Sequence, residues 1–297
     1  MTELNQAADQ LKPASPAQAG NRKLLGELLV AAGILKQPDI DRILQLQKKQ
    51  GLLFGEAAVK LGLLEPAQIL PLLAQQYGYP YLNPQQSQYS QELVMAFQPF
   101  SAQAEAFRSL RSELLQNWFN DPANKALAFL GLGETTGCSF ICANLAVSFS
   151  QLGLRTLLID TDLRKPRLHE IFGLSSTYGF ADALAGRIDL AQAIQQLPDI
   201  TDLSILPTGA PPPNPQELLA KPIFKQVLQT LAAQYDVILI DTTNGLLYAD
   251  FKPVLATAGG AVLTSRNHHS FLNDVRILQQ QISGAQAKLV GVVLNEF

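Results

Sequence analysis

Three aspartates and a glycine-rich loop in the second half of the sequence have the residue types to bind a nucleotide with a metal ion. Asp160 and Asp241 each end an apolar run, "LLID" and "ILID", and Asp162 follows the first of them by two residues. Ligands of open parallel sheets bind beyond the carboxyl ends of the strands, and Mg²⁺ prefers oxygen ligands. A single strand-end aspartate could simply cap a loop, but three beside a phosphate loop predict a magnesium site.

The glycine-rich loop is "GLGETTGCSF", residues 131–140, between the apolar run "ALAFLGL" and the amphipathic segment "CANLAVSFSQLG". Strand, glycine loop and helix in this order are typical of a P-loop, whose motif reads G-x-x-x-x-G-K-[ST]. Backbone N–H groups of such a loop and of the helix N-terminus hold phosphate whatever side chains are present. We expect nucleotide contacts from Thr136, Gly137, Cys138, Ser139 and Phe140.

Cys138 stands at the position where this motif carries its phosphate-binding lysine. A charge-assisted hydrogen bond contributes about 1.5–3 kcal/mol, so its loss predicts nucleotide binding weaker by roughly ten- to more than a hundredfold. Ser139 keeps the Ser/Thr position of the motif. Its hydroxyl would join Asp162 and Asp241 as an oxygen ligand of Mg²⁺.

Six apolar runs alternate with helical stretches after residue 124, which predicts parallel strands joined by crossover helices. The runs are nearly continuous in apolar residues, as expected of strands buried on both faces. The predicted fold is an α/β P-loop NTPase with a mostly parallel sheet flanked by helices. The runs are "KALAFLGL", "RTLLIDTD", "LSILPTG", "DVILIDTT", "GGAVLTSR" and "KLVGVVLN".

Composition excludes several classes of protein. The formal net charge of -3 shows no basic excess, so we expect no nucleic-acid partner. The N-terminus has no signal peptide pattern and no apolar run reaches the roughly 18 residues of a membrane helix, which predicts a cytoplasmic chain without a transmembrane segment of its own. With only 2 cysteines, a disulfide-stapled secreted fold is excluded.

An internal repeat precedes the P-loop region, because residues 24–47 and 53–76 match at a constant offset. Each copy predicts a short helix ending at a glycine, a turn with proline and a second amphipathic helix. The expected organisation is therefore a small all-α domain of two helical hairpins before the α/β domain. Its boundaries are a disordered leader at 1–20, the helical repeats at 21–84, a linker at 85–100 and the P-loop domain at 101–297.

Motifs over about residues 97–297 resemble the bacterial tyrosine kinases of polysaccharide export, most nearly the chain-length determinant kinases of the EpsG type. They include "PFSAQAEAFRSLRSEL", "LLIDTDLRKPRLHEIFGL", "PPPNPQELL" and "GVVLNEF". The resemblance implies ATP and Mg²⁺ as cofactors, with Ser139, Asp162 and Asp241 at the metal. It also implies that Asp160 accepts the proton of the attacking tyrosine, that Arg164 faces phosphate and that Asn295 contacts the base.

The same resemblance assigns subunit contacts to an E-x-x-R-x-x-R motif formed by Glu105, Arg108 and Arg111. Their spacing places the three on one helical face, which could also be a solvated charged face. The implied partners are a second copy of the chain, or a membrane-anchored polysaccharide chain-length determinant protein that would hold the chain at the inner membrane.

Several departures leave the activity open. Besides Cys138, Thr135 replaces a loop glycine, Thr243 and Asn244 replace paired prolines after Asp241, and no tyrosine-rich tail precedes the end at Phe297. We therefore weigh a weak kinase acting on exopolysaccharide export against a non-catalytic adaptor of the export machinery. A MinD- or ParA-type ATPase, or a dithiol redox pair of Cys138 and Cys142, is a lesser alternative. Any phosphorylation is expected in a mobile segment, residues 77–91, at Tyr77, Tyr79, Tyr81 or Tyr89.

The helical repeat resembles the N-terminal domain of type II secretion and pilus ATPases, in which a repeated R-L-G-x-x-L motif can bind cyclic dimeric GMP. Leu24 and Leu53 occupy the two arginine positions here, and Arg22 and Lys23 are the only basic residues nearby. We therefore interpret the repeat as a protein-interaction module in preference to a site for that dinucleotide.

Overall fold

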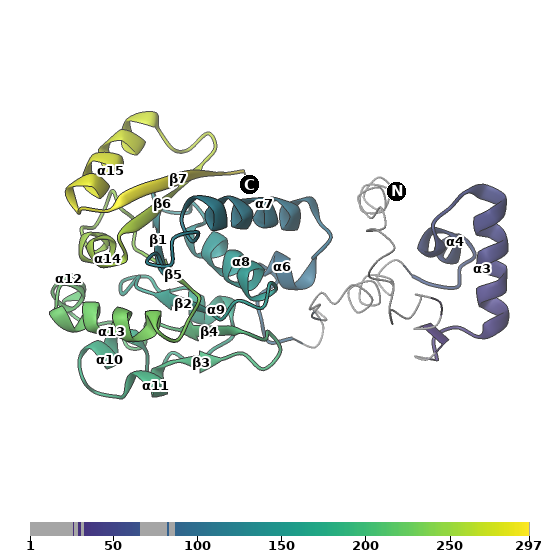
Figure 1. Cartoon of the computed structure of the whole chain (residues 1–297), viewed down its shortest axis with the longest axis horizontal. Helices are drawn as coiled ribbons and strands as arrows, with labels where there is room; N and C mark the ends of the chain where they lie inside the picture. Colours follow the sequence, from purple (N-terminus) through teal and green to yellow (C-terminus); the bar gives the residue numbers. More distant parts are fainter. Residues whose placement is uncertain (1–25, 27–28, 31–32, 66–81, 83–86, 297) are drawn as a thin grey trace. The chain divides into compact units, whose positions relative to one another are not determined.

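The computed structural model describes Gly26, residues 29–30, 33–65, Leu82 and 87–296 (Figure 1). The chain divides into two compact units, Met1–Gln86 with Ala96–Ala102 and Ser87–Met95 with Gln103–Phe297. Several predictions lie outside the described residues: the leader at 1–20, the dinucleotide-site positions Arg22, Lys23 and Leu24, the tyrosines Tyr77, Tyr79 and Tyr81, and Phe297.

The first unit contains the helices α3 (Gln37–Gln50) and α4 (Phe54–Lys60), whose apolar faces bury each other. Ile43 of α3 and Ala57 of α4 are completely buried there. The paired repeat positions Gly33 and Gly62 both adopt left-handed backbone, with φ of 69° and 66°, a conformation that costs glycine little. The two copies thus share a turn as well as a sequence pattern, and the predicted helical region is present.

The second unit is built on a seven-stranded sheet with the order β3-β4-β2-β5-β1-β6-β7. Every neighbouring pair is parallel except β3 and β4, which are antiparallel. All six apolar runs of the sequence form strands, so the mostly parallel sheet is confirmed. The strands are β1 (Ala126–Gly131), β2 (Thr156–Asp160), β3 (Gln195–Gln196), β4 (Leu203–Leu206), β5 (Val237–Asp241), β6 (Gly260–Arg266) and β7 (Lys288–Asn295).

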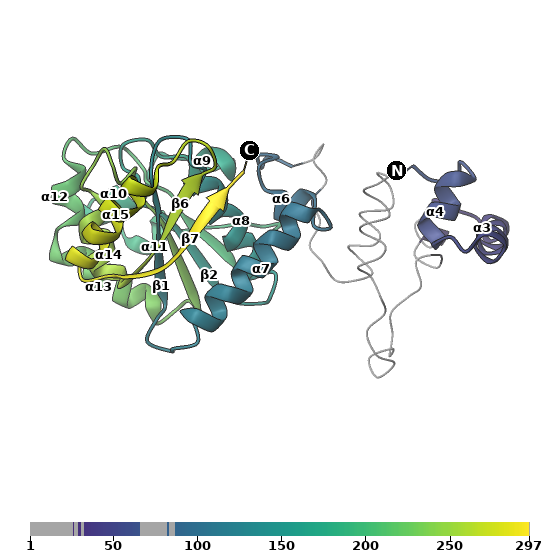
Figure 2. The same ribbon diagram turned by 90° about the horizontal axis from the view of Figure 1, so that it is seen from above.

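Helices cover both faces of this sheet. Figures 1 and 2 show α7 (Ala102–Asn117) and α8 (Cys138–Ser150) on one face, and α13 (Pro222–Ala232), α14 (Phe251–Ala258) and α15 (Leu272–Gly284) on the other. Shorter helices fill the connections: α6 (Val94–Phe97), α9 (Leu168–Ile171), α10 (Phe180–Leu184), α11 (Leu190–Ala193) and α12 (Pro215–Leu219).

The central strands β1, β2 and β5 are buried at every residue, which explains their continuous apolar sequence. The register of the sheet sets Asp160 of β2 directly beside Asp241 of β5. Two of the three predicted carboxylates are therefore held together by backbone pairing. β3 was missed because its two glutamines carry no strand pattern.

The predicted linker at 85–100 has a different character over residues 87–95, which belong to the second unit. Leu93 and Met95 are completely buried, and the Met95 N–H donates to Asn144 Oδ1 of α8 at 3.0 Å. Tyr89 is 5% exposed, and its hydroxyl donates to Asp199 at 3.3 Å. The prediction of an accessible, mobile Tyr89 is therefore wrong, because the apolar residues around it anchor the segment to the α/β unit.

Among the described residues, no helix combines the length and the apolar character needed to cross a lipid bilayer.

Candidate functional site

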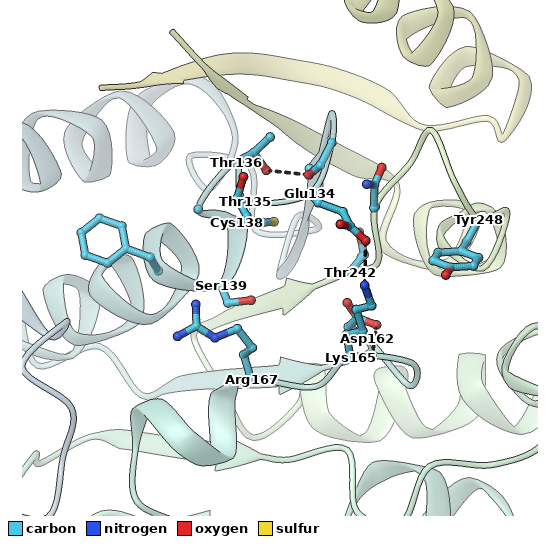
Figure 3. A pocket seen from close by; sticks show the side chains of 15 residues that line it. Glu134, Thr135, Thr136, Cys138, Ser139, Asp162, Lys165, Arg167, Thr242 and Tyr248 are labelled. Carbon is cyan, nitrogen blue, oxygen red and sulfur yellow. Dashed lines mark hydrogen bonds and ion pairs between the residues drawn. The ribbon is translucent and has the colours of Figure 1, made fainter. Parts of the chain in front are cut away.

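A pocket opens at the carboxyl ends of β1, β2 and β5, where the glycine-rich loop turns into α8 (Figure 3). It combines loop residues with side chains that follow β2 and β5. The structure thus brings the predicted loop and Asp162 into one pocket. Its lining consists of Gly131, Gly133, Glu134, Thr135, Thr136, Gly137, Cys138, Ser139, Phe140, Asp162, Lys165, Arg167, Thr242, Asn244 and Tyr248.

The loop holds two residues in the left-handed backbone region. Gly137, which precedes the first residue of α8, has φ of 82°, and Thr135 has φ of 58°. A β-branched residue in this conformation is strained by about 1–2 kcal/mol. The hydroxyl of Thr135 accepts a hydrogen bond from the Arg266 guanidinium at 3.3 Å, which helps to fix it. The loop therefore keeps a glycine-like shape at the position where the family pattern has glycine.

Asn295, at the end of β7, supports the loop from outside the pocket lining. Its amide donates to the carbonyl oxygen of Thr136 at 3.1 Å. The implied contact between Asn295 and a nucleotide base stays a prediction.

Cys138 begins α8 and lines the pocket, whereas Cys142 lies one turn later and is completely buried. Cys142 Sγ is 3.8 Å from Asp241 Oδ1. A hydrogen bond with the Cys142 side chain lowers the pKa of Cys138, while burial raises the pKa of Cys142 well above its usual value. The residue that follows Gly137 in the loop is thus a small thiol within 4.8 Å of a carboxylate oxygen of Asp241.

Asp160 and Asp241 are both almost completely buried, and burial is the main cause that raises the pKa of each well above the ordinary carboxyl value. Asp160 accepts backbone N–H groups from Asp162 at 3.1 Å, Arg167 at 3.2 Å and Leu168 at 3.1 Å. The loop-capping role therefore describes Asp160 well in this structure. The Oδ2 atom of Asp241, by contrast, has no hydrogen-bond partner among the described residues.

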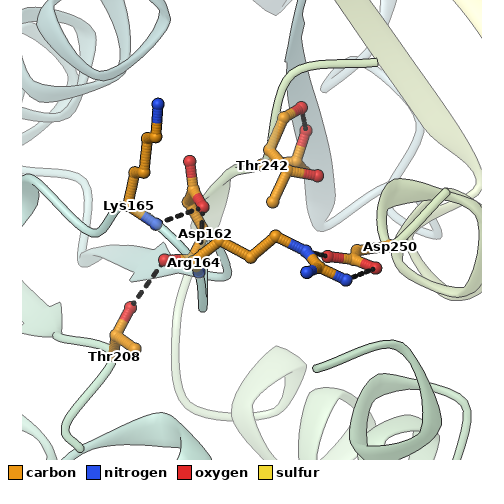
Figure 4. Close-up of polar contacts among 7 residues, drawn as sticks. Asp162, Arg164, Lys165, Thr208, Thr242 and Asp250 are labelled. Carbon is orange, nitrogen blue, oxygen red and sulfur yellow. Dashed lines mark hydrogen bonds and ion pairs between the residues drawn. The ribbon is translucent and has the colours of Figure 1, made fainter. Parts of the chain in front are cut away.

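Asp162 lies at the pocket wall and also shapes the loop after β2. Its Oδ1 accepts the backbone N–H groups of Arg164 at 3.1 Å and Lys165 at 2.9 Å (Figure 4). Figure 3 shows the side chains of Ser139 and Asp162 directed into the same pocket. Ser139 and Asp162 thus line one pocket, whereas Asp241 at the end of β5 is buried and is not among the described lining residues.

Arg164 is held away from the pocket lining. Its guanidinium makes two hydrogen bonds to the carboxylate of Asp250 (Figure 4). It also stacks on the Tyr248 ring, at 4.4 Å from the ring centroid. The ion pair occupies two of the five guanidinium N–H groups of Arg164 and fixes their direction toward Asp250.

Two other cations line the pocket in its place. Lys165 Nζ is 2.7 Å from Glu134 Oε1 of the loop, and the Arg167 guanidinium is 2.8 Å from Glu92 Oε1. Neither residue is among those predicted to form the site, although the basic run "LRKPR" directly follows the Asp160 and Asp162 pair. That run at a strand end was the available signal.

The predicted assembly residues lie on α7. Glu105 and Arg108 form an ion pair of 2.9 Å along the helix, and the Glu105 side chain is 55% exposed. Arg111 instead donates to the backbone carbonyl of Ser148 on α8 at 2.6 Å. Part of the motif therefore attaches α7 to its own unit, which spacing alone did not reveal.

This parallel sheet, with its strand, glycine loop and helix, defines the class of P-loop NTPase-like proteins. Residues 124–279 match the family model described as cellulose biosynthesis protein BcsQ. The putative tyrosine-protein kinase EpsB of Ralstonia solanacearum is 36% identical over 197 residues, 66% of this chain and 26% of EpsB. Tyrosine-protein kinase YwqD of Bacillus subtilis is 30% identical over 209 residues, 70% of this chain and 87% of YwqD.

The chain belongs to this family of bacterial tyrosine-protein kinases of polysaccharide export, and it spans only about a quarter of the length of EpsB. The kinase domain of Escherichia coli ETK has a TM-score of 0.68 at 27% identity, covering 72% of this chain and 84% of that one. The chimerical protein CapA2B2 has a TM-score of 0.65 at 32% identity, covering 75% and 96%.

The wider P-loop class also has a nucleotide-bound representative. MinD of Pyrococcus horikoshii, in complex with Mg-ADP, has a TM-score of 0.51 at 26% identity and covers 58% of this chain and 70% of MinD.

Proposed function

We propose that the chain is a kinase-like P-loop protein that acts in exopolysaccharide chain-length control and binds ATP weakly. The observation that carries this proposal is the pocket itself, in which the glycine-rich loop and Asp162 line the same cavity as Cys138, the residue at the lysine position of the motif. Backbone N–H groups at the start of α8 remain available for phosphate. The lost side-chain charge would weaken binding by about ten- to more than a hundredfold.

The residues present fit a magnesium ion. Ser139, Asp162 and Asp241 offer the hard oxygen ligands that Mg²⁺ prefers, and the unpaired, buried Oδ2 of Asp241 favours a cation beside it. When bound, Mg²⁺ would neutralise charge on the phosphates. Asp160 would be the proton acceptor for a tyrosine hydroxyl. Because both of its oxygens accept backbone N–H groups, at least one of these hydrogen bonds would first have to open.

Lys165 is the side chain proposed to supply part of the missing charge. Of the described residues lining the pocket, only Lys165 and Arg167 are cationic. We expect Lys165→Met to lower the affinity for Mg-ATP by about tenfold, since one charge-assisted contact would be lost. Calorimetric titration measures this, with Lys252→Met on the exposed side of α14 as the matched control. If Lys165→Met and wild type bind Mg-ATP with equal affinity, Lys165 does not contact the nucleotide.

A phosphotransfer assay tests the kinase function itself. Wild-type chain and Cys138→Lys are incubated with Mg-ATP, and phosphotyrosine is measured by mass spectrometry. We expect slow or undetectable transfer by wild type, because the missing cation also removes stabilisation of the transition state. Wild-type turnover equal to that of the lysine variant would refute the weakened site. Absence of transfer in both, with intact Mg-ATP binding, would favour a non-catalytic adaptor of the export machinery.

Assembly is proposed to use the exposed part of the α7 motif, with a second copy or a membrane-anchored chain-length determinant protein as partner. Such a partner would place the chain at the cytoplasmic face of the inner membrane. We expect the molar mass of wild type in light scattering to rise with concentration and Glu105→Lys to suppress this rise, because it reverses an exposed charge. Glu113→Lys, exposed on the same helix, is the control. Identical behaviour of the three proteins would contradict the interface.

The first unit is proposed as a protein-interaction module of the type II secretion ATPase N-terminal kind. Leu53 stands at the one described position where a cyclic dinucleotide site of that kind would have arginine. The paired left-handed glycines Gly33 and Gly62 support the hairpin repeat on which this proposal rests.

A further inference from the structure

Two thiols and one carboxylate converge where α8 begins beside the end of β5. Cys138 Sγ, Cys142 Sγ and a carboxylate oxygen of Asp241 lie within 4.8 Å of one another. The spacing of the cysteines places both thiols on one side of the helix, and the buried Cys142 Sγ is 3.8 Å from Asp241 Oδ1. Three groups of metal-ligating type thus approach one point from two elements.

The Asp241 carboxylate is the incomplete member of this group. The residue is 1% exposed, and its Oδ2 has no hydrogen-bond partner among the residues that the structure describes. A buried charge is costly unless it is paired or bound to a metal. In the P-loop motif a lysine ammonium stands at the position of Cys138, whereas this chain offers a thiol there. The Asp241 carboxyl group therefore keeps one oxygen that could bind a cation.

We propose that Cys138, Cys142 and Asp241 form a binding site for a thiophilic divalent cation of the zinc class, a site distinct in chemistry from the proposed magnesium site. Two sulfurs and one carboxylate oxygen are a ligand set that Zn²⁺ uses. Tetrahedral Zn²⁺ with metal–ligand distances of about 2.0–2.3 Å separates its ligands by about 3.4–3.8 Å. The Cys142–Asp241 separation of 3.8 Å already lies in this range, and the other two separations, within 4.8 Å, reach it with shifts of at most about 1.4 Å.

The protein supplies three ligands, which leaves one position of a tetrahedral ion for water or a ligand from the pocket. Cys138 lines that pocket, so an ion has a route from solvent to the buried Cys142 and Asp241. On binding, each thiol releases its proton to solvent as a metal–sulfur bond forms, and no electron is transferred. Because Asp241 belongs to both sites, zinc and Mg-ATP should compete.

The test uses the full chain, freed of metal by chelation under reducing conditions and dialysed against Zn²⁺ or Co²⁺. We expect one tightly held zinc per chain by atomic absorption, and a thiolate-to-cobalt charge-transfer band with Co²⁺. Cys142→Ser should weaken zinc binding at least about tenfold, since even changes outside the direct ligands cost that much. Cys138→Lys should abolish the band while retaining the fold, because lysine is the residue that the motif carries there.

The exposed pair His268 and His269 is the main source of adventitious zinc binding among the described residues, so His268→Ala/His269→Ala serves as the control and should leave the cobalt band unchanged. A cobalt spectrum without thiolate character, or a band that survives in Cys138→Lys, would overturn the site. Loss of both free thiols without bound metal would overturn it in favour of a disulfide. These readouts involve no nucleotide, so weak or absent ATP binding leaves the result interpretable.

Discussion

Replacement of Arg164 by alanine is expected to lower the free energy of unfolding by about 3 kcal/mol, because it leaves a buried carboxylate without its counter-ion. Asp250 has a side chain only 1% exposed, and both hydrogen bonds of the ion pair come from the Arg164 guanidinium. The Tyr248 ring loses its stacked cation in the same variant. Urea denaturation monitored by circular dichroism measures the change.

The chain provides a matched control for this prediction. Arg155 and Asp236 form a second two-point ion pair, but their side chains are 58% and 33% exposed. We expect Arg155→Ala to cost about 1 kcal/mol or less, since exposed ion pairs contribute little. Equal losses in the two variants would show that burial of Asp250 does not determine the cost. Near-wild-type stability of Arg164→Ala would leave Arg164 available for phosphate, as the family resemblance implies.

The sheet was predictable because its strands have continuous apolar sequences, which in β1, β2 and β5 reflect burial on both faces; β7 is apolar in sequence although it is partly exposed. Each of the six runs became a strand, including β5 with its closing Asp241. The segment at 87–95 was not predictable in this way. Its tyrosine and polar residues suggest a linker, whereas long-range contacts such as that of Met95 with Asn144 determine its position.

The positions of site residues were predictable from the sequence where the residues belong to a motif. They were not predictable where pairing with a residue far away in the chain determines the orientation of the side chain. Asp162 and Ser139 fell into one pocket because strand ends and the loop have fixed places in the fold. The orientation of Arg164 depends on Asp250, 86 residues later in the chain. No local sequence pattern predicts that partner. Lys165 follows Arg164 directly, and it is the residue that reaches the pocket.

Cys138→Lys is expected to raise the affinity for Mg-ATP by about ten- to a hundredfold. The variant restores a point charge against the β- and γ-phosphates where the P-loop motif has one. The ammonium would also lie close to the buried carboxyl group of Asp241. Ser139→Ala in the same background should reduce the gain by removing a metal ligand.

Turnover is expected to recover less than binding in this variant. Thr135 keeps its strained φ of 58° in the loop, and the lysine does not relieve it. Thr135→Gly added to Cys138→Lys should therefore increase phosphotransfer beyond the single change. No further increase would show that the loop backbone is already competent.

Parallel calorimetric titrations of wild type and Cys138→Lys with ATP and ADP, with and without Mg²⁺, test whether the pocket binds nucleotide but lacks a cation at position 138. We predict weak binding by wild type that improves with Mg²⁺, and binding by Cys138→Lys at least about tenfold tighter for Mg-ATP. Wild-type protein that already binds Mg-ATP as tightly as the lysine variant would contradict the claim.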